Sequence, residues 1–333
     1  MNMNAENRSG SPFVSPAAVE AWDTWFRWRE NGVLRDDTVE TTWRRVACAL
    51  ASVEQGSEYA GFELRLFDAF AAWHLLVDER LLATAGTGKE SWLGSELVAV
   101  LNVAGFVRKY ATAEARIDLA MMKDCAALAV RALDNAMLLG NDSGQEPKKL
   151  RVGIIGLAEA LALLGLDYGG MKARREAQSI AQSLAEGCLR ATVVLAETRG
   201  PTMHCDASWA ERARLRDMPA NLIERARLHG VRHASLTSIT SQPRLAKFAN
   251  ATSDAVLPLA ASDALLVRRG SWPSVSSAAS VLAQLEIRGA MQPWIDEPIS
   301  CPVRLHGMPM PANHFDWYAR AAALELGALS WFQ

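Results

Sequence analysis

The sequence lacks the cysteine spacings that bind zinc or form a redox pair close in the chain. Its five cysteines, Cys48, Cys125, Cys188, Cys205 and Cys301, are scattered, and no two form a Cys-x-x-C pair. It also lacks an N-terminal apolar segment of signal-peptide length and any run of about 18 apolar residues that would span a bilayer. We therefore predict a cytoplasmic protein with reduced thiols and no membrane contact.

An excess of charge of either sign is missing as well. The formal net charge of the 333 residues is −2, and the isoelectric point is about 6.3. Such a chain has no global attraction to nucleic-acid phosphates or to an anionic membrane. Because half of the residues are hydrophobic, the chain is able to bury a full core. We predict a globular protein without a nucleic-acid partner.

Strand patterns are few. The candidates are residues 99–106, 234–240 and 327–332, and only the second alternates clearly between β-branched and small residues. Helical patterns dominate the rest of the chain. The first is predicted to begin near Asp37, because Asp37 and Glu40 have the spacing of a capping box.

The apolar spacing of the helical segments predicts which faces are buried. In the first helix the stripe consists of four side chains at i, i+3, i+4 and i+7, namely Trp43, Val46, Ala47 and Leu50. Residues 115–140 and 172–199 show helical patterns of greater length. Gly200 followed by Pro201 is a typical end of the second of these helices.

Six segments occur in an order that resembles one known family. They are LLATAGTGKESWLGSELV at residues 81–98, AVRALDNAMLL at 129–139, GIIGLAEALALLGLDY at 153–168, LAETRGP at 195–201, RHASLTSIT at 232–240 and MQPWIDEPIS at 291–300. In their amino-acid sequence and in their order, these segments are similar to the large (alpha) subunit of ribonucleotide reductases, and most closely to the adenosylcobalamin-dependent class. Each match is short, and the resemblance rests on all six together.

The resemblance implies a helix-rich α/β fold built around part of the reductase-type barrel. Family members are longer, and between Gly88 and Leu133 this chain has room for only a short connection. The middle of the barrel, with its radical-cysteine loop, is therefore missing. We predict a disordered N-terminus at residues 1–15, a helical N-terminal region at 16–85 and a truncated or remodelled barrel at 86–333. The open edges of such a barrel favour a protein partner or self-association.

The resemblance also places Glu96 where the family has a cysteine of its electron-delivering pair. Glutamate has no two-electron couple, whereas a thiol pair cycles reversibly with its disulfide. Adenosylcobalamin is therefore implied as a cofactor only if the family activity survives. The chain is interpreted as a shortened and degenerate homologue.

The existing thiols offer few reactive candidates. Cys48, Cys125 and Cys188 lie on apolar helical patterns and are interpreted as core thiols. Cys301 falls where the family has ordinary residues. Cys205 follows a predicted helix end, and two interpretations stay open for it, a reactive thiol and an unreactive loop thiol.

The family's substrate-phosphate loop, a Pro-Thr-Gly-Thr turn, corresponds here to Ser241, Gln242, Pro243 and Arg244. Proline removes a backbone donor, and the flexible glycine is lost. Arg244 still offers a guanidinium that pairs well with phosphate. Two interpretations stay open: weak phosphate or nucleotide binding by Ser241, Gln242 and Arg244, or a turn without a ligand.

Two further motifs contain residues of types that bind ligands. His229 and His233 have the spacing of a helical metal pair, but Gly230 and Val231 between them indicate a helix end, so we predict no metal site. The stretch from Gly153 to Gly156 has no predicted strand before it and lacks the third glycine of a dinucleotide loop. We interpret it as a close-packing turn at the start of a helix.

Three functions are compatible with this sequence. The first is a non-catalytic homologue that acts as a binding or regulatory partner, with a full-length reductase as the candidate partner and a homo-oligomer as the other expected assembly. The second is an active or split reductase that converts ribonucleotides to deoxyribonucleotides by radical chemistry. The third is a module that senses deoxynucleotides. The glutamate at position 96 favours the first.

Overall fold

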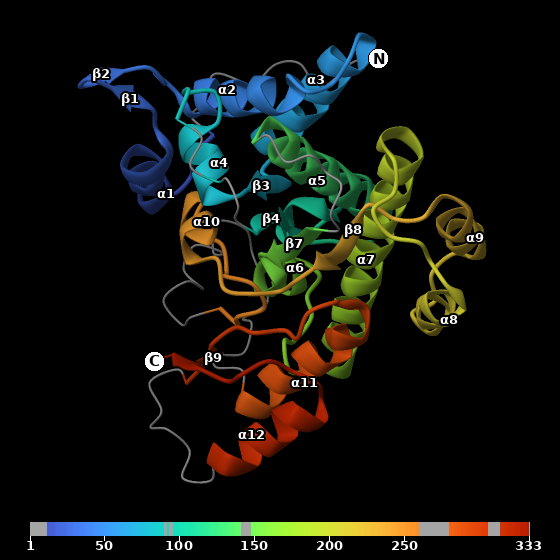
Figure 1. Ribbon diagram of the computed structural model, residues 1–333. Coiled ribbons are helices and arrows are strands. Elements are labelled where there is room, and N and C mark those ends of the chain that lie inside the picture. Colours follow the sequence, from blue (N-terminus) through green and yellow to red (C-terminus); the bar gives the residue numbers. More distant parts are fainter. Residues whose placement is uncertain are drawn as a thin grey trace.

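The computed structural model describes residues 12–89, 92, 96–140, 148–259, 280–305 and 314–332. Figure 1 shows a helix-rich α/β arrangement, which confirms the predicted class. Most of the N-terminus that was predicted to be disordered, residues 1–11, lies outside the described part of the chain. The predicted boundary between residues 85 and 86 stays a prediction.

A four-stranded sheet forms the centre of the molecule. In spatial order its strands are β3 (Leu75–Val77), β4 (Leu97–Asn102), β7 (Lys148–Ile155) and β8 (His233–Thr237). β3 runs antiparallel to β4, whereas β4, β7 and β8 are parallel to one another. β4 is buried along almost its whole length, as is typical of a central strand whose two faces are both covered.

Two long helices lie side by side against the sheet, α5 (Leu119–Leu139) and α7 (Met171–Arg199). They agree closely with the two long helices predicted from sequence. The side chain of Asp118 caps α5 by accepting from the amide of Met121. The helices approach closely at Gly187, where a β-carbon would come within 2.8 Å of the Ala126 side chain. A residue larger than glycine would force them apart.

The N-terminal helices α2 (Val39–Ala51) and α3 (Ser57–Ala71) pack on each other and on α5. All four residues of the predicted stripe on α2, Trp43, Val46, Ala47 and Leu50, are buried. The predicted capping box is wrong by one position. Thr38 accepts from the amide of Thr41, and the Thr41 hydroxyl accepts from the amide of Thr38, because the helix begins at Val39.

An aromatic cluster joins the N-terminal helical region to a later helix. The elements involved are α1 (Pro16–Ala21), the π-helical turn η1 (Trp22–Phe26) and α10 (Pro243–Phe248). The ring of Phe248 lies 4.9 Å from that of Phe26 and 5.1 Å from that of Trp73, centroid to centroid. Such pairs add to the burial of apolar area, so α10 is held against the N-terminal region.

Short elements complete the described residues before β8. They are β1 (Arg29–Glu30), β2 (Val33–Leu34), α4 (Glu79–Thr84), η2 (Val103–Phe106), β5 (Val107–Arg108), β6 (Arg116–Ile117), α6 (Leu157–Leu163), α8 (Ala207–Leu215) and α9 (Ala220–His229). In Figure 1, α8 and α9 project beside α7, on the opposite side of the molecule from α10. None of the helices in the described ranges is both long and apolar enough to cross a bilayer.

The C-terminal part covers the outer edge of β8. Its elements are α11 (Val281–Met291), η5 (Gln292–Trp294), β9 (Val303–Arg304), α12 (His314–Ala323) and β10 (Trp331–Phe332). A carboxylate oxygen of Asp296 accepts from the amides of Leu236 and Thr237, and Ser300 pairs with Thr240 in an isolated bridge. Residues of the C-terminal part therefore occupy positions along the outer edge of β8, and the association expected from open barrel edges stays a prediction.

The strands of the described residues do not close into a barrel. The central sheet is open, and the remaining strands form two-stranded pairs. The helix-rich α/β prediction is thus confirmed, whereas the barrel that the resemblance implies is present in these ranges only as an open sheet of four strands. Closure of a barrel needs strands that are paired on both edges throughout.

The prediction for Gly153 and Gly156 was half right. A strand does precede the turn, since Gly153 lies within β7, and the absence of a strand was wrong. Close packing is confirmed. A β-carbon at Gly156 would collide with the Asn102 side chain, and Gly156 has a φ of 73°, a left-handed conformation that favours glycine.

Candidate functional site: a cavity beside a buried ionic network

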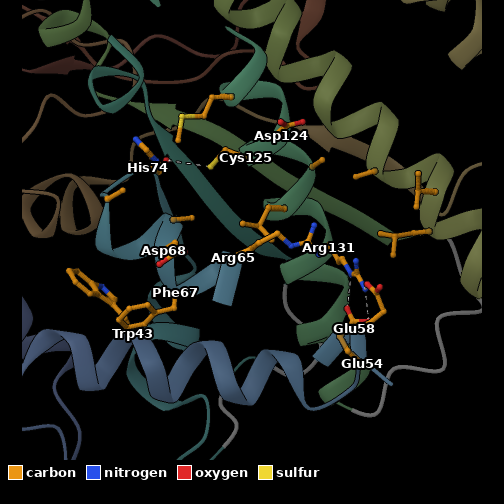
Figure 2. Close-up of a pocket in the computed structure, with 18 of the residues that line it drawn as sticks. Trp43, Glu54, Glu58, Arg65, Phe67, Asp68, His74, Asp124, Cys125 and Arg131 are labelled. Carbon is orange, nitrogen blue, oxygen red and sulfur yellow. Dashed lines mark hydrogen bonds and ion pairs between the residues drawn. The ribbon is translucent and has the colours of Figure 1, made fainter. Parts of the chain in front are cut away.

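A cavity of about 1700 Å³ lies between α3, α5 and α7 (Figure 2). One face of α5 forms its floor, with Met121, Cys125 and Leu128 at helical spacing. α7 contributes Val194 and Leu195. Because the wall is built from rigid helices, its apolar surface is formed before anything binds.

One end of the cavity is charged. Both carboxylate oxygens of Glu54 accept from Arg131, at 2.7 and 2.8 Å, and Arg131 also reaches Glu58 at 3.0 Å. Burial of Glu54 acts to raise its pKa, but the hydrogen bonds from Arg131 and Asn135 and the charge of Arg199 outweigh it. They lower the pKa of Glu54 to about 2. Glu54 is therefore ionised at neutral pH.

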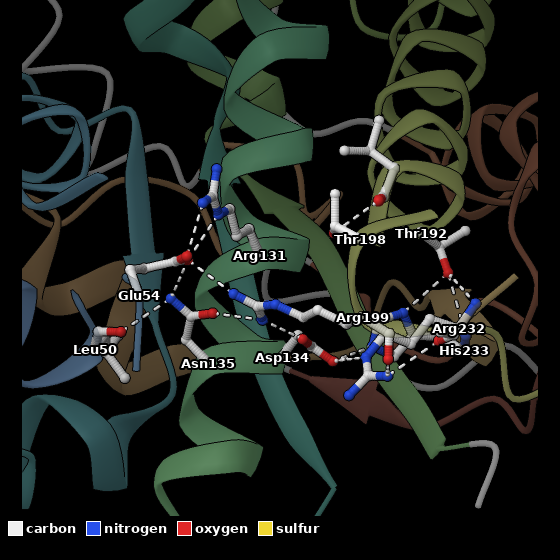
Figure 3. A network of polar contacts seen from close by, with 12 residues as sticks. Leu50, Glu54, Arg131, Asp134, Asn135, Thr192, Thr198, Arg199, Arg232 and His233 are labelled. Atoms are coloured by element: carbon white, nitrogen blue, oxygen red, sulfur yellow. Dashed lines mark hydrogen bonds and ion pairs between the residues drawn. The ribbon is translucent and has the colours of Figure 1, made fainter. Parts of the chain in front are cut away.

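Behind this wall a network of polar side chains continues into the interior (Figure 3). The amide nitrogen of Asn135 donates to Leu50 O at 2.9 Å and to Glu54 at 2.8 Å. Its oxygen accepts from Arg199 at 2.8 Å. Arg199 also pairs with Glu54 at 2.9 Å and with Asp134. Arg199 is thus the link between the cavity wall and the interior.

The innermost members are Asp134, Arg232, His233 and Thr192. Asp134 Oδ1 accepts from Arg232 Nε at 2.7 Å and lies 3.2 Å from His233 Nε2. Thr192 Oγ1 accepts from the amides of Arg232 and His233, at 2.9 and 3.1 Å, and lies 3.0 Å from His233 Nδ1. The Thr192 hydroxyl and the Asp134 carboxylate thus lie within hydrogen-bond distance of the two ring nitrogens of His233.

This order of hydroxyl, imidazole and carboxylate resembles a hydrolytic triad, but the chemistry does not fit. Thr192 is fully buried and its oxygen already accepts two amide hydrogens, so no substrate reaches it. The carboxylate of Asp134 is buried too, and although burial alone would raise its pKa, His233 and Arg232 lower it. The network joins α5, α7 and the start of β8 as a structural unit.

The other end of the cavity contains His74 and Cys125. His74 Nε2 donates to Gly105 O at 3.0 Å, and burial lowers the pKa of His74, so the ring is neutral. The Cys125 thiol lies 3.9 Å from the carbonyl oxygen of His74. Burial raises the pKa of Cys125 to about 12. A protonated, buried thiol is a poor nucleophile, so this end offers contacts rather than chemistry.

The predicted phosphate loop lies away from the cavity. The Gln242 amide donates to Asp254 Oδ1 at 2.6 Å, and the Ser241 hydroxyl donates to the other oxygen of Asp254. Arg244 points elsewhere: it pairs with Glu79 at 3.1 Å. Asp254 is half-buried, and burial raises its pKa. The Asp254 carboxylate therefore accepts hydrogen bonds from the donors that the resemblance assigns to a substrate phosphate.

The other predicted residues are spread over the molecule. Glu96 is exposed just before β4, with a carboxylate oxygen 3.6 Å from Arg151. Cys205 is buried, and burial raises its pKa to about 11, which favours the unreactive of its two interpretations. His229 lies 3.7 Å from Glu197, apart from His233 in the network. No cluster of three His, Cys, Asp or Glu side chains suited to a metal occurs in the described ranges.

The expectation of core thiols holds for two of the three cysteines for which it was made, since Cys125 and Cys188 are buried. Cys301 is buried as well. Cys48 is only half-buried, because its sulfur lies 3.3 Å from Glu63 at the side of α2 rather than inside the apolar stripe. Burial and the neighbouring Glu63 carboxylate raise the pKa of Cys48, so this thiol is also protonated at neutral pH.

Sequence reasoning missed the cavity and the roles of Glu54 and Arg199. Asp134 and Asn135 had been noted only as part of a family signature. They are two polar residues inside a helix that is otherwise mostly apolar, and such residues need buried partners. That signal predicts a network but does not identify its distant members.

Comparison with known proteins supports the resemblance for the central part of the chain. Residues 96–253 match the family model described as ribonucleotide reductase, barrel domain. The matched segment extends from β4 through α10 and includes Asp134, Arg199 and His233. No curated protein matches the chain. This central segment is thus similar to the barrel domain of ribonucleotide reductases, and the chain is ribonucleotide-reductase-like.

Proposed function

We propose that this ribonucleotide-reductase-like chain does not itself reduce ribonucleotides and acts as a binding or regulatory partner, with a full-length reductase as the candidate partner. The premise is the similarity of residues 96–253 to the reductase barrel domain. We also propose that the chain is related most closely to the adenosylcobalamin-dependent class of reductases and that it is located in the cytoplasm.

The contact between Asp254 and the loop of Ser241 and Gln242 carries the proposal. The Gln242 amide and the Ser241 hydroxyl are the donors that would receive a substrate phosphate, and both are bound to the Asp254 carboxylate. A phosphate entering this loop would have to displace a carboxylate that is already hydrogen-bonded and would face its negative charge. Arg244, the remaining candidate, is paired with Glu79.

The thiols support the same conclusion. A chain that accepts a radical from adenosylcobalamin and reduces ribose needs an accessible radical thiol and a redox pair. The resemblance places Glu96 at one of these positions, and the five cysteines are free and lie in different segments. The pKa values of Cys125 and Cys205 are raised to about 12 and about 11. The described residues do not fit the chemistry of this cofactor.

The cavity supports a binding role. Pockets for small molecules usually occupy about 300–1,000 Å³, and the cavity of about 1700 Å³ between α3, α5 and α7 is larger. A helix-lined space of this size with an apolar floor suits a polypeptide segment, as in helix-in-groove recognition. Val194, which is 39 % exposed, lies in its wall.

The first test is turnover. The purified protein is incubated with a ribonucleotide, adenosylcobalamin and a dithiol, and deoxyribonucleotide formation is measured. We expect none. Turnover by the protein alone would overturn the proposal, and turnover only after mixing with a second chain would favour the split reductase instead.

The second test is partner binding. The protein is titrated into a full-length reductase while complex formation and reductase activity are followed. We expect binding that Val194→Glu weakens, since this change puts a charge into the apolar wall of the cavity. Val33→Glu is the matched control, because Val33 is 56 % exposed on β2 and does not line the cavity. No binding, or equal binding by both variants, would count against this surface.

A further inference from the structure

The cavity between α3, α5 and α7 has unused polar groups at one end. Trp43 and His74 lie on one side of it, and Glu54 and Glu58 lie on the other (Figure 2). The indole rings of Trp43 and Trp73 are 5.1 Å apart, centroid to centroid, and His74 follows Trp73 in the chain. We call the part of the cavity beside Trp43 and His74 the aromatic end.

The aromatic end offers one unused donor and one unused acceptor. Trp43 is 1 % exposed, and its indole N–H has no acceptor among the described residues. His74 is 8 % exposed, and its Nε2 donates to Gly105 O, since a carbonyl oxygen only accepts. Burial lowers the pKa of His74, so the neutral ring keeps a lone pair on Nδ1. In the described ranges nothing donates to this lone pair. Such a pair of atoms suits a ligand group that both accepts and donates.

Three charged side chains of the wall have no ion partner in the described part of the chain. Arg65 and Asp68 lie one turn apart on α3, and Glu40 lies one turn before Trp43 on α2. Asp68 is nearer than Arg65 to the end of α3, which leads to the aromatic end. The unpaired charges are thus two carboxylates near the aromatic end and one guanidinium a turn farther away. A complementary partner brings opposite charges in the same order.

The construction of the wall favours a helix as the occupant. The wall consists mainly of helices, whose backbone groups are hydrogen-bonded within each helix. An extended segment would find no strand edge there, whereas a helix satisfies its own backbone groups. A helix that is about 10–12 Å wide and rises about 1.5 Å per residue fills roughly 120–170 Å³ per residue. The cavity of about 1700 Å³ therefore accommodates about three to four turns.

We propose that the cavity binds an amphipathic helix of a partner protein with three polar side chains in fixed places. A carboxamide reaches the aromatic end, a basic side chain faces Asp68, and an acidic side chain faces Arg65. The apolar face of the helix lies on α5 and α7, at Leu128 and Val194. This inference rests on the proposed function and adds the chemistry of the segment that the partner contributes.

A carboxamide, as in asparagine or glutamine, fits both unused atoms of the aromatic end. Its N–H donates to His74 Nδ1, and its oxygen accepts from Trp43 Nε1. A carboxylate would leave the lone pair of Nδ1 without a donor, and it would meet the negative charges of Glu40 and Asp68. An ammonium group would leave the indole N–H without an acceptor.

Synthetic peptides test the proposal on the purified full chain. The probe is a labelled helical peptide of about four turns with leucines on one face, a glutamine and a lysine in one terminal turn and a glutamate in the next. Fluorescence anisotropy measures its Kd. Replacement of the lysine by glutamate should weaken binding roughly tenfold or more, and Asp68→Lys should restore it. Glu224→Lys on α9, which does not line the cavity, is the matched control and should leave the Kd of either peptide unchanged.

Replacement of the peptide glutamine by methionine tests the aromatic end. It should weaken binding to the parent chain roughly tenfold. It should not weaken binding to the variant His74→Phe, which has no Nδ1. Phenylalanine keeps a ring beside Phe106, and circular dichroism checks that this variant is folded. The peptide change leaves the protein itself intact, so an unaltered Kd with the parent chain would overturn the carboxamide contact whatever the variant does.

The outcomes separate this inference from the proposed function. No binding of the peptide, or binding that the charge exchange leaves unchanged, overturns the inference. Binding of a full-length reductase to the same chain would then leave the proposed function standing. Peptide binding with the expected exchange supports the inference, and a lack of reductase binding would in that case remove only the reductase as the partner.

Discussion

Glu54 and Arg199 are 145 positions apart in the chain, and Glu54 Oε1 lies 2.9 Å from Arg199 Nη2 in the structure. Glu54 follows α2, outside the segment that matches the reductase barrel domain, whereas Arg199 is the last residue of α7, inside it. This ion pair closes one end of the cavity. It also ties the N-terminal helices to the reductase-like segment.

Removal of Arg199 should destabilise the protein strongly. Arg199→Ala leaves Asp134 and Glu54 with fewer partners, although both carboxylates are nearly fully buried. Breaking a buried ion pair in this way costs about 3–5 kcal/mol. Urea unfolding measures the loss. Arg35→Ala is the control, since Arg35 pairs with Glu30 at an exposed site and should contribute less than about 1 kcal/mol. Equal losses would contradict the assigned role.

Stability should fall in acid because of Glu54. Its folded pKa is about 2 against an ordinary value of 4.5, so its contribution is present above pH 4.5 and is lost as the pH falls toward 2. The free energy of unfolding is measured by urea at several pH values in this window. Glu54→Gln has no carboxyl to titrate there and should show a shallower dependence. A pH dependence identical to that of the parent chain would disprove the assignment.

The Thr192 hydroxyl should be essential to the inner network. Thr192→Val removes the acceptor of two buried amides and the partner of His233 Nδ1, which should cost about 2–4 kcal/mol. Thr192→Ser keeps the hydroxyl and should cost less. Thr198→Val on the same helix is the control, because Thr198 is exposed and its hydroxyl donates only to Val194 O. Thermal unfolding compares the three variants, and similar melting temperatures would refute the network.

The close approach at Gly156 should show in a pair of glycine variants. Gly156→Ala introduces a β-carbon that collides with Asn102, in addition to the strain of a positive φ. Gly165→Ala adds only the strain, since its φ is +68° and nothing lies within 4 Å of the new carbon. Left-handed strain costs about 1–2 kcal/mol, so Gly156→Ala should lose more than that. Chemical denaturation measures the free energy of unfolding of both variants. Equal losses of stability would mean that the packing around Gly156 relaxes freely.

Cys205 should react slowly with a thiol reagent at pH 8. Burial raises its pKa to about 11, so only a small fraction is thiolate at that pH. Alkylation followed by peptide mapping compares its labelling rate in the native chain and in denaturant. We expect much faster labelling in denaturant. Rapid native labelling of Cys205 would favour the reactive interpretation instead.

Local patterns predicted the helices well. The stripe from Trp43 to Leu50 is buried, and α7 ends at Arg199 before Gly200, as the periodicity and the glycine indicated. These features depend on neighbouring residues only. The cap of α2 was misplaced because Asp37 and Thr38 are both good capping residues, and the choice between them depends on the path of the chain before the helix.

The resemblance was readable from short segments, and its central part agrees with the match of residues 96–253 to the reductase barrel domain. The sequence predicted the loss of the phosphate loop only in part. The sequence showed Pro243 in place of a flexible residue, but it did not indicate that Asp254, 12 positions after Gln242, would take the loop's donors. A hydrogen bond of that kind is decided by how the loop folds back.

The sequence by itself determined the helices, the helix-rich α/β class and the family likeness, because each depends on the periodicity or order of residues close together in the chain. Only the tertiary structure decided the open sheet, the cavity and the ionic network. Glu54, Asp134, Arg199 and His233 carry no local signal for one another. Their contacts exist because burial of charged groups requires partners, and packing of α2, α5, α7 and β8 brings those partners within reach.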